Sequence, residues 1–250
     1  LMLSVSINHP DSEDFIDAKM EQGKVTGANV SVRIDDDFMR AVKNKTAYTQ
    51  KYPVFSDAPK FSKEIEAEKL WKKIVHNAWK SAEPGILFWD TVINESVPDC
   101  YADLGYKTVS TNPCGEIPLC PYDSCRLLAI NLFSYVEDPF TTKAKFNYTL
   151  FKKHISAAQR IMDDIIDLEL EKIDAILQKI DADPENEDVK GVERNLWLNI
   201  KKKAEEGRRT GIGITAEGDM LAGLGIKYGS EEGVAFSTEI HKNIALAAYR

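Results

Sequence analysis

The sequence contains few of the residues that mark fibrous or low-complexity proteins, and it has no long apolar run. Only 14 of its 250 residues are glycine and 10 are proline, which excludes a collagen-like or low-complexity chain. No apolar stretch approaches the roughly 18 residues that a membrane-spanning helix needs. The N-terminal segment lacks the basic flank of a signal peptide. We therefore expect a cytoplasmic protein without a membrane partner.

Positive charge is also in short supply. The 32 Lys and Arg residues are outnumbered by 40 Asp and Glu residues, which gives a net charge of −8. This balance disfavours nucleic acid or an anionic membrane surface as the main partner, although local groups can still bind a small phosphorylated ligand. The hydrophobic fraction of 43% is typical of a globular protein with a packed core.

Both ends of the sequence have the pattern of a domain interior. Apolar residues alternate from the first position through Ile7, which predicts a strand that begins at once. Residues 230–250 predict an amphipathic helix with no stop signal after it. We expect a fragment of a longer polypeptide.

Strands and helices alternate between these ends, a pattern that indicates parallel pairing in an α/β sheet or barrel. Residues 44–61 are polar and are predicted as a loop, and residues 90–126 as an ordered loop region. Helices are predicted after Asp11 and at 38–44, 62–81, 148–180, 189–206 and 230–250. Strands are predicted at 1–7, 30–34, 86–89, 127–135 and 207–215.

Chemically capable side chains concentrate in the segment Asn112-Pro-Cys-Gly-Glu116. Asn112, Cys114 and Glu116 occupy alternating positions, and in an extended loop alternating side chains project to the same side. Pro113 restrains the backbone, and Gly115 permits close approach of a ligand. We expect Cys114 at a loop tip, with all three side chains facing one cavity.

The spacing of the four cysteines argues against a metal site. Cys100, Cys114, Cys120 and Cys125 are separated by thirteen, five and four residues, which lacks the paired hooks of zinc sites. Transient redox chemistry remains open, and small buried fillers are the ordinary alternative. We leave Cys100 and Cys120 unassigned.

Other polar motifs favour structural roles. The four histidines are scattered and predict surface or packing positions. Arg208 and Arg209 are placed to end a helix rather than to bind phosphate. Gly211 and Gly213 lack the third glycine of a dinucleotide fingerprint and predict close strand packing.

The motif and its context resemble the large, catalytic subunit of ribonucleotide reductases, in particular the adenosylcobalamin-dependent class. Cys125 follows Cys114 by eleven positions, and further matching segments occur in the family's order. They are Leu1 to Asp11, Asn29 to Val32, Ala82 to Phe88, Leu127 to Leu132, Arg208 to Ile214 and Gly218 to Leu221.

The resemblance implies a fold and a set of catalytic roles. Residues 1–250 would be one incomplete catalytic domain, part of a ten-stranded α/β barrel whose central finger loop spans about 108–126. Cys114 would carry a thiyl radical that abstracts the 3′-hydrogen of a ribonucleotide. Glu116 would be the base, and Asn112 would orient the sugar. Thr111, Asn112 and Glu116 would contact the substrate.

The resemblance also implies a redox pair, a cofactor and partners. Cys125 would be one redox-active cysteine, with its partner outside this chain. Adenosylcobalamin would be the cofactor of the full-length enzyme, a ribonucleoside-diphosphate reductase, and the fragment alone would be inactive. A thioredoxin- or glutaredoxin-type protein would be the reductant, and a homodimer is expected. Two alternatives stay open: the metal-dependent class, which needs a separate radical-generating subunit, and an inactive barrel fragment that acts as a scaffold.

Overall fold

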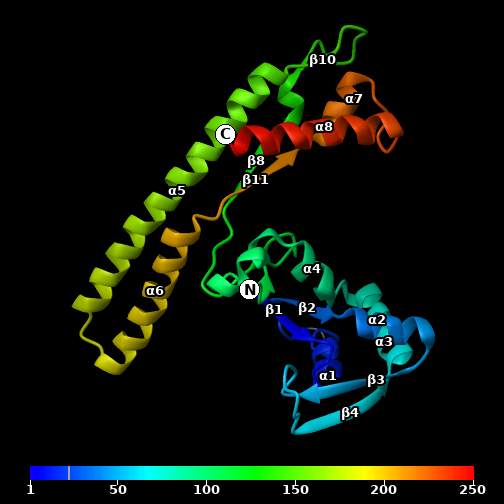
Figure 1. Ribbon diagram of the computed structural model, residues 1–250, viewed down its shortest axis with the longest axis vertical. Coiled ribbons are helices and arrows are strands. Elements are labelled where there is room, and N and C mark those ends of the chain that lie inside the picture. The colour runs from blue at the N-terminus through cyan, green and yellow to red at the C-terminus, as the bar shows by residue number, and fades with distance from the viewer. Residues whose placement is uncertain (22) are drawn as a thin grey trace. The chain divides into compact units, whose positions relative to one another are not determined.

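The computed structural model describes residues 1–21 and 23–250 and has the predicted mixture of strands and helices. Contacts divide the chain into two compact units, Leu1–Pro121 and Tyr122–Arg250. Each unit is described by itself below, with the element labels of Figure 1.

The first unit is built on a parallel sheet with the strand order β1-β2-β5. The strands are β1 (Met2–Ser6), β2 (Asn29–Ile34) and β5 (Gly85–Phe88). Arg33 of β2 pairs with Leu87 of β5, so these two side chains lie on the same face. All three predicted strands are confirmed.

Three helices pack on the opposite face of this sheet. They are α1 (Ser12–Asp17), α2 (Asp36–Asn44) and α3 (Ala67–Ser81). Asp35 caps α2 because its carboxylate accepts the Phe38 N–H at 2.7 Å. Burial of apolar side chains stabilises this layer. Its core consists of Ile7, Ile16, Val32, Ile34, Phe38, Ala41, Tyr48, Ala67, Leu70 and Ile74.

Two sequence predictions are wrong between residues 47 and 66: the loop at 44–61 and the start of the helix at 62. These residues form an antiparallel hairpin of β3 (Ala47–Tyr52) and β4 (Phe61–Glu66). The helical periodicity begins only at Ala67, because the backbone groups of 61–66 bond to those of β3. Gln50 anchors the hairpin, since its side-chain amide donates to the Ile7 carbonyl at 2.8 Å.

The predicted loop region 90–126 is partly helical. It begins with α4 (Trp89–Glu95) and the 3₁₀ helix η1 (Val97–Leu104). A two-stranded antiparallel hairpin follows, formed by β6 (Ser110–Thr111) and β7 (Pro118–Leu119). Residues 112–117 between these strands hold the motif that the sequence singled out.

The second unit combines a parallel strand pair with four helices. The pair is β8 (Leu127–Asn131) and β11 (Gly211–Thr215). A Cβ at Gly211 would lie 2.9 Å from the Arg126 carbonyl, which confirms the predicted close packing there, whereas a Cβ at Gly213 would have ordinary contact at 3.8 Å. The helices are α5 (Tyr148–Ala182), α6 (Glu187–Gly207), α7 (Glu217–Leu224) and α8 (Glu231–Ala248). Shorter elements are the 3₁₀ helix η2 (Leu132–Tyr135), β9 (Val136–Glu137) and β10 (Lys145–Phe146).

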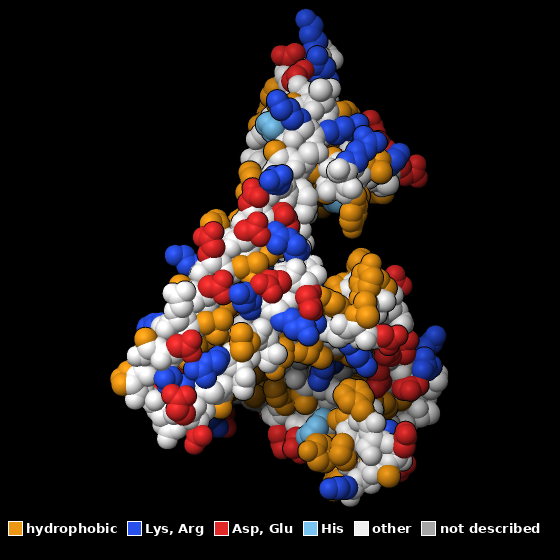
Figure 2. Space-filling view, turned by 60° about the vertical axis from the view of Figure 1, so that its left-hand side comes forward, with side chains coloured by type: hydrophobic (Ala, Val, Ile, Leu, Met, Phe, Trp, Pro, Cys, Tyr) orange, Lys and Arg blue, Asp and Glu red, His pale blue; other side chains and the backbone are white. Residues whose placement is uncertain are grey.

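Helices α5 and α6 lie side by side and run antiparallel (Figure 1). Basic and acidic side chains alternate over the helical surface in Figure 2. Ion pairs link the two helices, as between Lys201 and Asp174 at 2.6 Å. The predicted long helix is confirmed, whereas α7 and the β9-β10 pair were not predicted.

Strand pairing within the described residues gives one three-stranded and four two-stranded sheets, and none of them closes into a barrel. In the same part of the chain, no helix combines the length and apolarity needed to span a membrane.

Candidate functional site

The motif Asn112 to Glu116 forms the tip of the β6-β7 hairpin. The Gly115 N–H donates to the Asn112 carbonyl at 3.0 Å, and the Asn112 N–H donates to the Ile117 carbonyl at 3.1 Å. Gly115 has a φ of +86°, a left-handed conformation that glycine adopts without steric cost. Cys114 therefore lies in a tight turn at the tip, as predicted.

The expectation that this segment is extended is wrong. The turn changes the direction of the backbone between Asn112 and Gly115, so alternation along the sequence no longer places three side chains on one side. Cys114 and Glu116 are exposed, whereas Asn112 is only 8% exposed. A shared cavity for the three side chains stays a prediction.

Asn112 holds the hairpin together from within. Its Oδ1 accepts the Ile117 N–H at 2.9 Å, which ties the first strand of the loop to the second. Thr111 is buried beside it, and its hydroxyl donates to the Asn112 carbonyl at 3.0 Å. The Nδ2 of Asn112 is left as the group that can donate to a ligand.

Two side chains outside the motif support the base of the hairpin. Asp99 of η1 accepts the Thr108 N–H at 2.9 Å. Arg33 of β2 donates from Nη1 to the Val109 carbonyl at 3.2 Å. Sequence reasoning missed both residues, although a charged side chain at position 33, within the alternating strand that contains Val30, Val32 and Ile34, was a usable signal.

The tip of the hairpin approaches the sheet at β5. A Cβ built on Gly115 would lie 3.4 Å from Cδ2 of Leu87. Because Leu87 and Arg33 are neighbours on one face of the sheet, the hairpin lies on the face opposite helices α1, α2 and α3. Rigid strands thus position the turn that carries Cys114.

The surroundings of the Arg33 guanidinium change its pKa. The guanidinium lies over the ring of Trp89, with 4.8 Å from its central carbon to the ring centroid. Loss of solvent lowers the pKa of Arg33, because burial disfavours the charged form.

Cys125 lies in the second unit, in a segment held by arginines. The Arg126 side chain is only 6% exposed and pairs with Glu169 of α5 at 2.5 Å. Its Nη1 donates to the Arg209 carbonyl at 2.9 Å. Arg209 itself pairs with Asp123 at 2.5 Å, so residues on both sides of the exposed Cys125 are fixed.

The two unassigned cysteines differ in exposure. Cys100 is exposed in η1, whereas Cys120 is buried at the end of β7. The Cys120 thiol lies 3.7 Å from the Pro121 carbonyl oxygen. Its environment fits the ordinary role of cysteine as a small buried residue.

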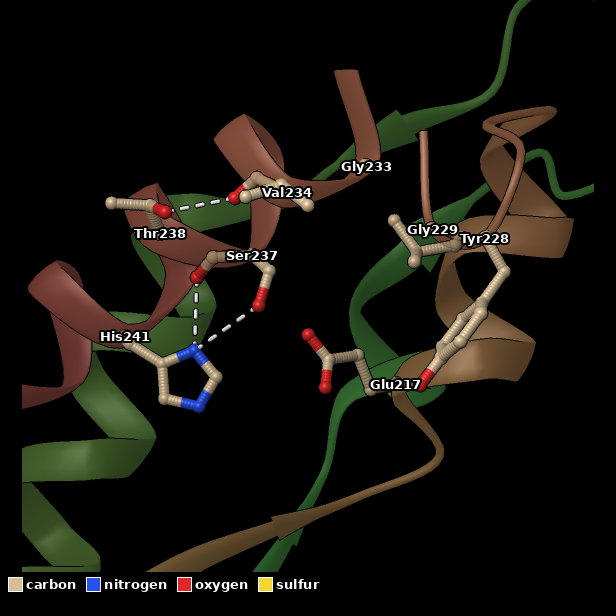
Figure 3. Close-up of a pocket in the computed structure, with 9 residues that line it drawn as sticks. Glu217, Tyr228, Gly229, Gly233, Val234, Ser237, Thr238 and His241 are labelled. Carbon is tan, nitrogen blue, oxygen red and sulfur yellow. Dashed lines mark hydrogen bonds between the residues drawn. The ribbon is translucent and has the colours of Figure 1, made fainter. Parts of the chain in front are cut away.

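A cavity of about 490 Å³ lies between α7 and α8 (Figure 3). It brings Glu217, Ser237 and His241 to one place, a grouping that sequence reasoning missed. Nδ1 of His241 lies 2.9 Å from the Ser237 carbonyl and 3.4 Å from its hydroxyl. A carbonyl only accepts, so Nδ1 carries the proton and cannot activate the serine.

The remaining polar motifs have structural partners. Arg208 ends α6 and pairs with Asp163 at 2.7 Å and Asp167 at 2.9 Å, so the prediction of a helix-ending cation is confirmed. No group of three or more His, Cys, Asp or Glu side chains arranged to hold a metal ion occurs within the described ranges.

Comparison with known proteins gives one consistent result. Residues 1–250 match the family described as "Ribonucleotide reductase, barrel domain". The vitamin B12-dependent ribonucleoside-diphosphate reductase of Thermoplasma acidophilum is 31% identical over 237 residues, 94% of this chain and 26% of that protein. Its namesake from Mycobacterium tuberculosis is 30% identical over 249 residues, 99% of this chain and 31% of that protein.

A solved structure is similar as well. The class Id ribonucleotide reductase alpha subunit of Actinobacillus ureae superposes with a TM-score of 0.68 at 17% sequence identity, and covers 99% of this chain and 39% of its own. At 17% sequence identity, this similarity supports the fold and not the function. The chain spans about a quarter to a third of the length of the curated relatives named above.

Proposed function

The chain belongs to the ribonucleotide reductase barrel-domain family, and from that premise we propose that it is part of a polypeptide that reduces ribonucleotides. The substrates are ribonucleoside diphosphates, as the names of the two relatives suggest. In this proposal residues 1–250 are one incomplete catalytic domain of the ten-stranded α/β type, with a finger loop at about 108–126. The observation that carries the proposal is the braced hairpin that presents Cys114 at its exposed tip.

Each residue of the hairpin has a chemical task in this proposal. A thiyl radical on Cys114 takes the hydrogen atom from C3′, while the Glu116 carboxylate accepts the proton of the 3′-hydroxyl. A positioned base of this kind typically contributes about 10²–10⁴-fold to the rate. Asn112 donates from Nδ2 to a sugar hydroxyl, and its Oδ1 keeps the turn in shape. Thr111 completes the substrate contacts.

Cys125 supplies electrons for loss of the 2′-hydroxyl. It acts with a second cysteine outside this chain, and the two thiols together give two electrons and two protons. One proton leaves with the 2′-oxygen as water, and the other replaces the lost group at C2′. The pair ends as a disulfide, and Cys114 returns its hydrogen to C3′. A thioredoxin- or glutaredoxin-type dithiol then reduces the disulfide by exchange.

The cofactor of the full-length enzyme is adenosylcobalamin, after the vitamin B12 dependence in the names of the relatives. When bound, it supplies the radical that removes the hydrogen of a cysteine thiol. The Cys114 thiol fits this need, because it is exposed and makes no hydrogen bond with the described residues. The active protein is a cytoplasmic homodimer.

Anaerobic turnover of the full-length polypeptide tests the proposal. With a dithiol and adenosylcobalamin, the wild type should form 2′-deoxyribonucleotides without a second subunit. Cys114→Ser should abolish product and leave substrate binding nearly unchanged, because serine lacks the weak S–H bond. Cys100→Ser is the matched control, since it changes another exposed cysteine and should retain activity.

Three outcomes would reject parts of the proposal. Substantial product from Cys114→Ser would remove the radical role of that residue. Activity that ignores adenosylcobalamin but needs a metal-containing subunit would assign the other class. A full-length wild type that is inactive with either radical source would favour the scaffold alternative.

A further inference from the structure

A second polar cavity, of about 270 Å³, lies where the strands of the first unit end. Its lining includes Asn8 after β1, Arg33 near the end of β2 and Trp89 after β5, together with Lys51 of the β3-β4 hairpin. The carboxyl ends of parallel strands are the usual place for ligands in open α/β sheets. None of the catalytic roles proposed above uses this cavity.

Arg33 is a half-buried cation that forms no ion pair with the described residues. Its Nε is buried without a hydrogen-bond partner among residues 1–21 and 23–250. One bond to the Val109 carbonyl and the ring of Trp89 are its partners. A buried donor without an acceptor, such as this Nε, is costly unless a ligand supplies the missing partner.

A second unsatisfied atom lies in the lining of the same cavity. Oδ1 of Asn8 is buried and has no hydrogen-bond partner among the described residues. Lys51 makes one long contact, from Nζ to the Ser56 carbonyl at 3.4 Å. The cavity therefore offers two cations with unused donors and one unused acceptor.

The two carboxylates in the lining are already occupied. Asp35 accepts from the Phe38 N–H and from the Tyr48 hydroxyl, each at 2.7 Å. Asp90 accepts from the Asp36 N–H at 2.7 Å. Both carboxylates thus bond to groups at or near the N-terminal end of α2, where negative charge is favourable. The unsatisfied groups of the lining named above are therefore the donors of Arg33 and Lys51 and the acceptor Oδ1 of Asn8.

We propose that this cavity is a binding site for a phosphate-type oxyanion, either inorganic phosphate or a small phosphomonoester. Ionised oxygens accept from Arg33 Nε and Lys51 Nζ, and a P–OH group donates to Asn8 Oδ1, so each unsatisfied atom gains a partner. Phe55, which is 87% exposed, and Trp89 form apolar walls for the organic part of an ester. Through Arg33 and Val109 the site also contacts the base of the hairpin that carries Cys114.

Calorimetric titration of the full-length polypeptide tests the site, with substrate and effector nucleotides saturating so that their own phosphate subsites are filled. The probes are inorganic phosphate, ribose 5-phosphate and acetate at constant ionic strength. Phosphate or the ester should bind at one site per chain, and the tighter of the two identifies the natural source. Arg33→Gln should weaken binding by at least about tenfold. Arg40→Gln, which removes an exposed arginine of α2, should not.

A second variant keeps the arginine and covers the case in which Arg33→Gln does not fold. Asn8→Asp places a carboxylate in the cavity that Arg33 also lines, so it should raise the unfolding midpoint and weaken phosphate binding at least about tenfold. Absence of saturable binding to wild type, as expected if water alone fills the cavity, overturns the proposal. So does unchanged binding in Asn8→Asp, or acetate binding as tightly as phosphate. These results do not depend on ribonucleotide turnover.

Discussion

The two polar atoms of the Asn112 side-chain amide have different roles, one in the fold of the hairpin and the other in the proposed chemistry. Oδ1 accepts the Ile117 N–H at 2.9 Å and fixes the turn, which leaves Nδ2 for the substrate. Because the side chain is only 8% exposed, its rotamer is held by the hairpin itself. A side chain held in this way loses little conformational entropy when it binds.

Two substitutions separate these tasks. Asn112→Asp keeps an acceptor for Ile117 but loses the Nδ2 donor, so we expect an unchanged unfolding midpoint and a loss of about 10–100-fold in kcat/KM. Asn112→Ala loses both groups and should also lower the midpoint. Steady-state kinetics and thermal unfolding of the full-length enzyme measure both effects. Equal activity in Asn112→Asp and wild type would contradict the proposed donor.

Gly115 is needed for its backbone conformation. With a φ of +86° and Leu87 at 3.4 Å from a built Cβ, Gly115→Ala should destabilise the hairpin by about 1–2 kcal/mol. The matched control is Gly191→Ala in α6, where a Cβ meets nothing within 4 Å; it should stabilise by about 0.5–1 kcal/mol. Thermal unfolding should show shifts of opposite sign, and a stabilising Gly115→Ala would refute the turn.

At the scale of elements, three segments of the second unit meet around Cys125. The buried Arg126 pairs with Glu169 of α5 and bonds to the Arg209 carbonyl next to β11. The Arg209 side chain forms an ion pair with Asp123, on the other side of Cys125. This network determines the path of the chain on both sides of the cysteine, which a redox role requires.

Removing one partner of the buried pair should disturb this segment. Glu169→Gln leaves Arg126 buried without its counter-ion, and we expect a loss of a few kcal/mol in stability. Asp174→Asn removes an exposed partner of Lys201 and should cost at most about 1 kcal/mol. Urea unfolding measures both losses. Mass spectrometry of alkylated Cys125 should show faster labelling only in Glu169→Gln, and equal labelling would argue against a positioning role.

At the scale of the whole molecule, acidic residues outnumber basic ones. Ion pairs lower the pKa of some of these carboxyl groups. The hydrogen bond and charge of Arg208 hold the pKa of Asp163 below its ordinary value. The pKa of Glu137 is lowered by its hydrogen bond to Lys145 and, to a smaller extent, by its hydrogen bond to Asn147. A carboxyl group whose pKa is lower in the folded state contributes stability above its unfolded pKa. That contribution is lost as the pH falls through the folded pKa.

The unfolding midpoint should therefore fall between about pH 5 and pH 3, the range in which these carboxylates take up protons. Asp163→Asn should have a lower midpoint at pH 7 and a shallower acid decline. Glu171→Gln, an exposed carboxylate of α5 without an ion-pair partner among the described residues, should follow the wild type. Thermal scans across this range test the assignment, and parallel curves for wild type and Asp163→Asn would contradict it.

The sequence by itself determined the elements whose pattern is local. Helix α5 follows from its apolar period and β2 from its alternating valines. A helix near Phe38 was likewise predicted from the sequence, although α2 begins two residues earlier, at Asp36. These signals lie within one turn or one strand, so no distant contact is needed to interpret them. The motif around Cys114 was likewise recognisable from residue type and order.

Only the tertiary structure decided the features that depend on distant partners. The strands at 47–52 and 61–66 exist because they pair with each other, and a polar alternation cannot identify the partner of a strand. The motif around Cys114 was predicted to be extended, but it forms a turn because Ile117 and Asn112 are joined by hydrogen bonds. The environment of the half-buried Arg33 also depends on residues far away in sequence, Val109 and Trp89. Burial of a single polar residue is a property of the packed chain, because it requires neighbours that local periodicity does not specify.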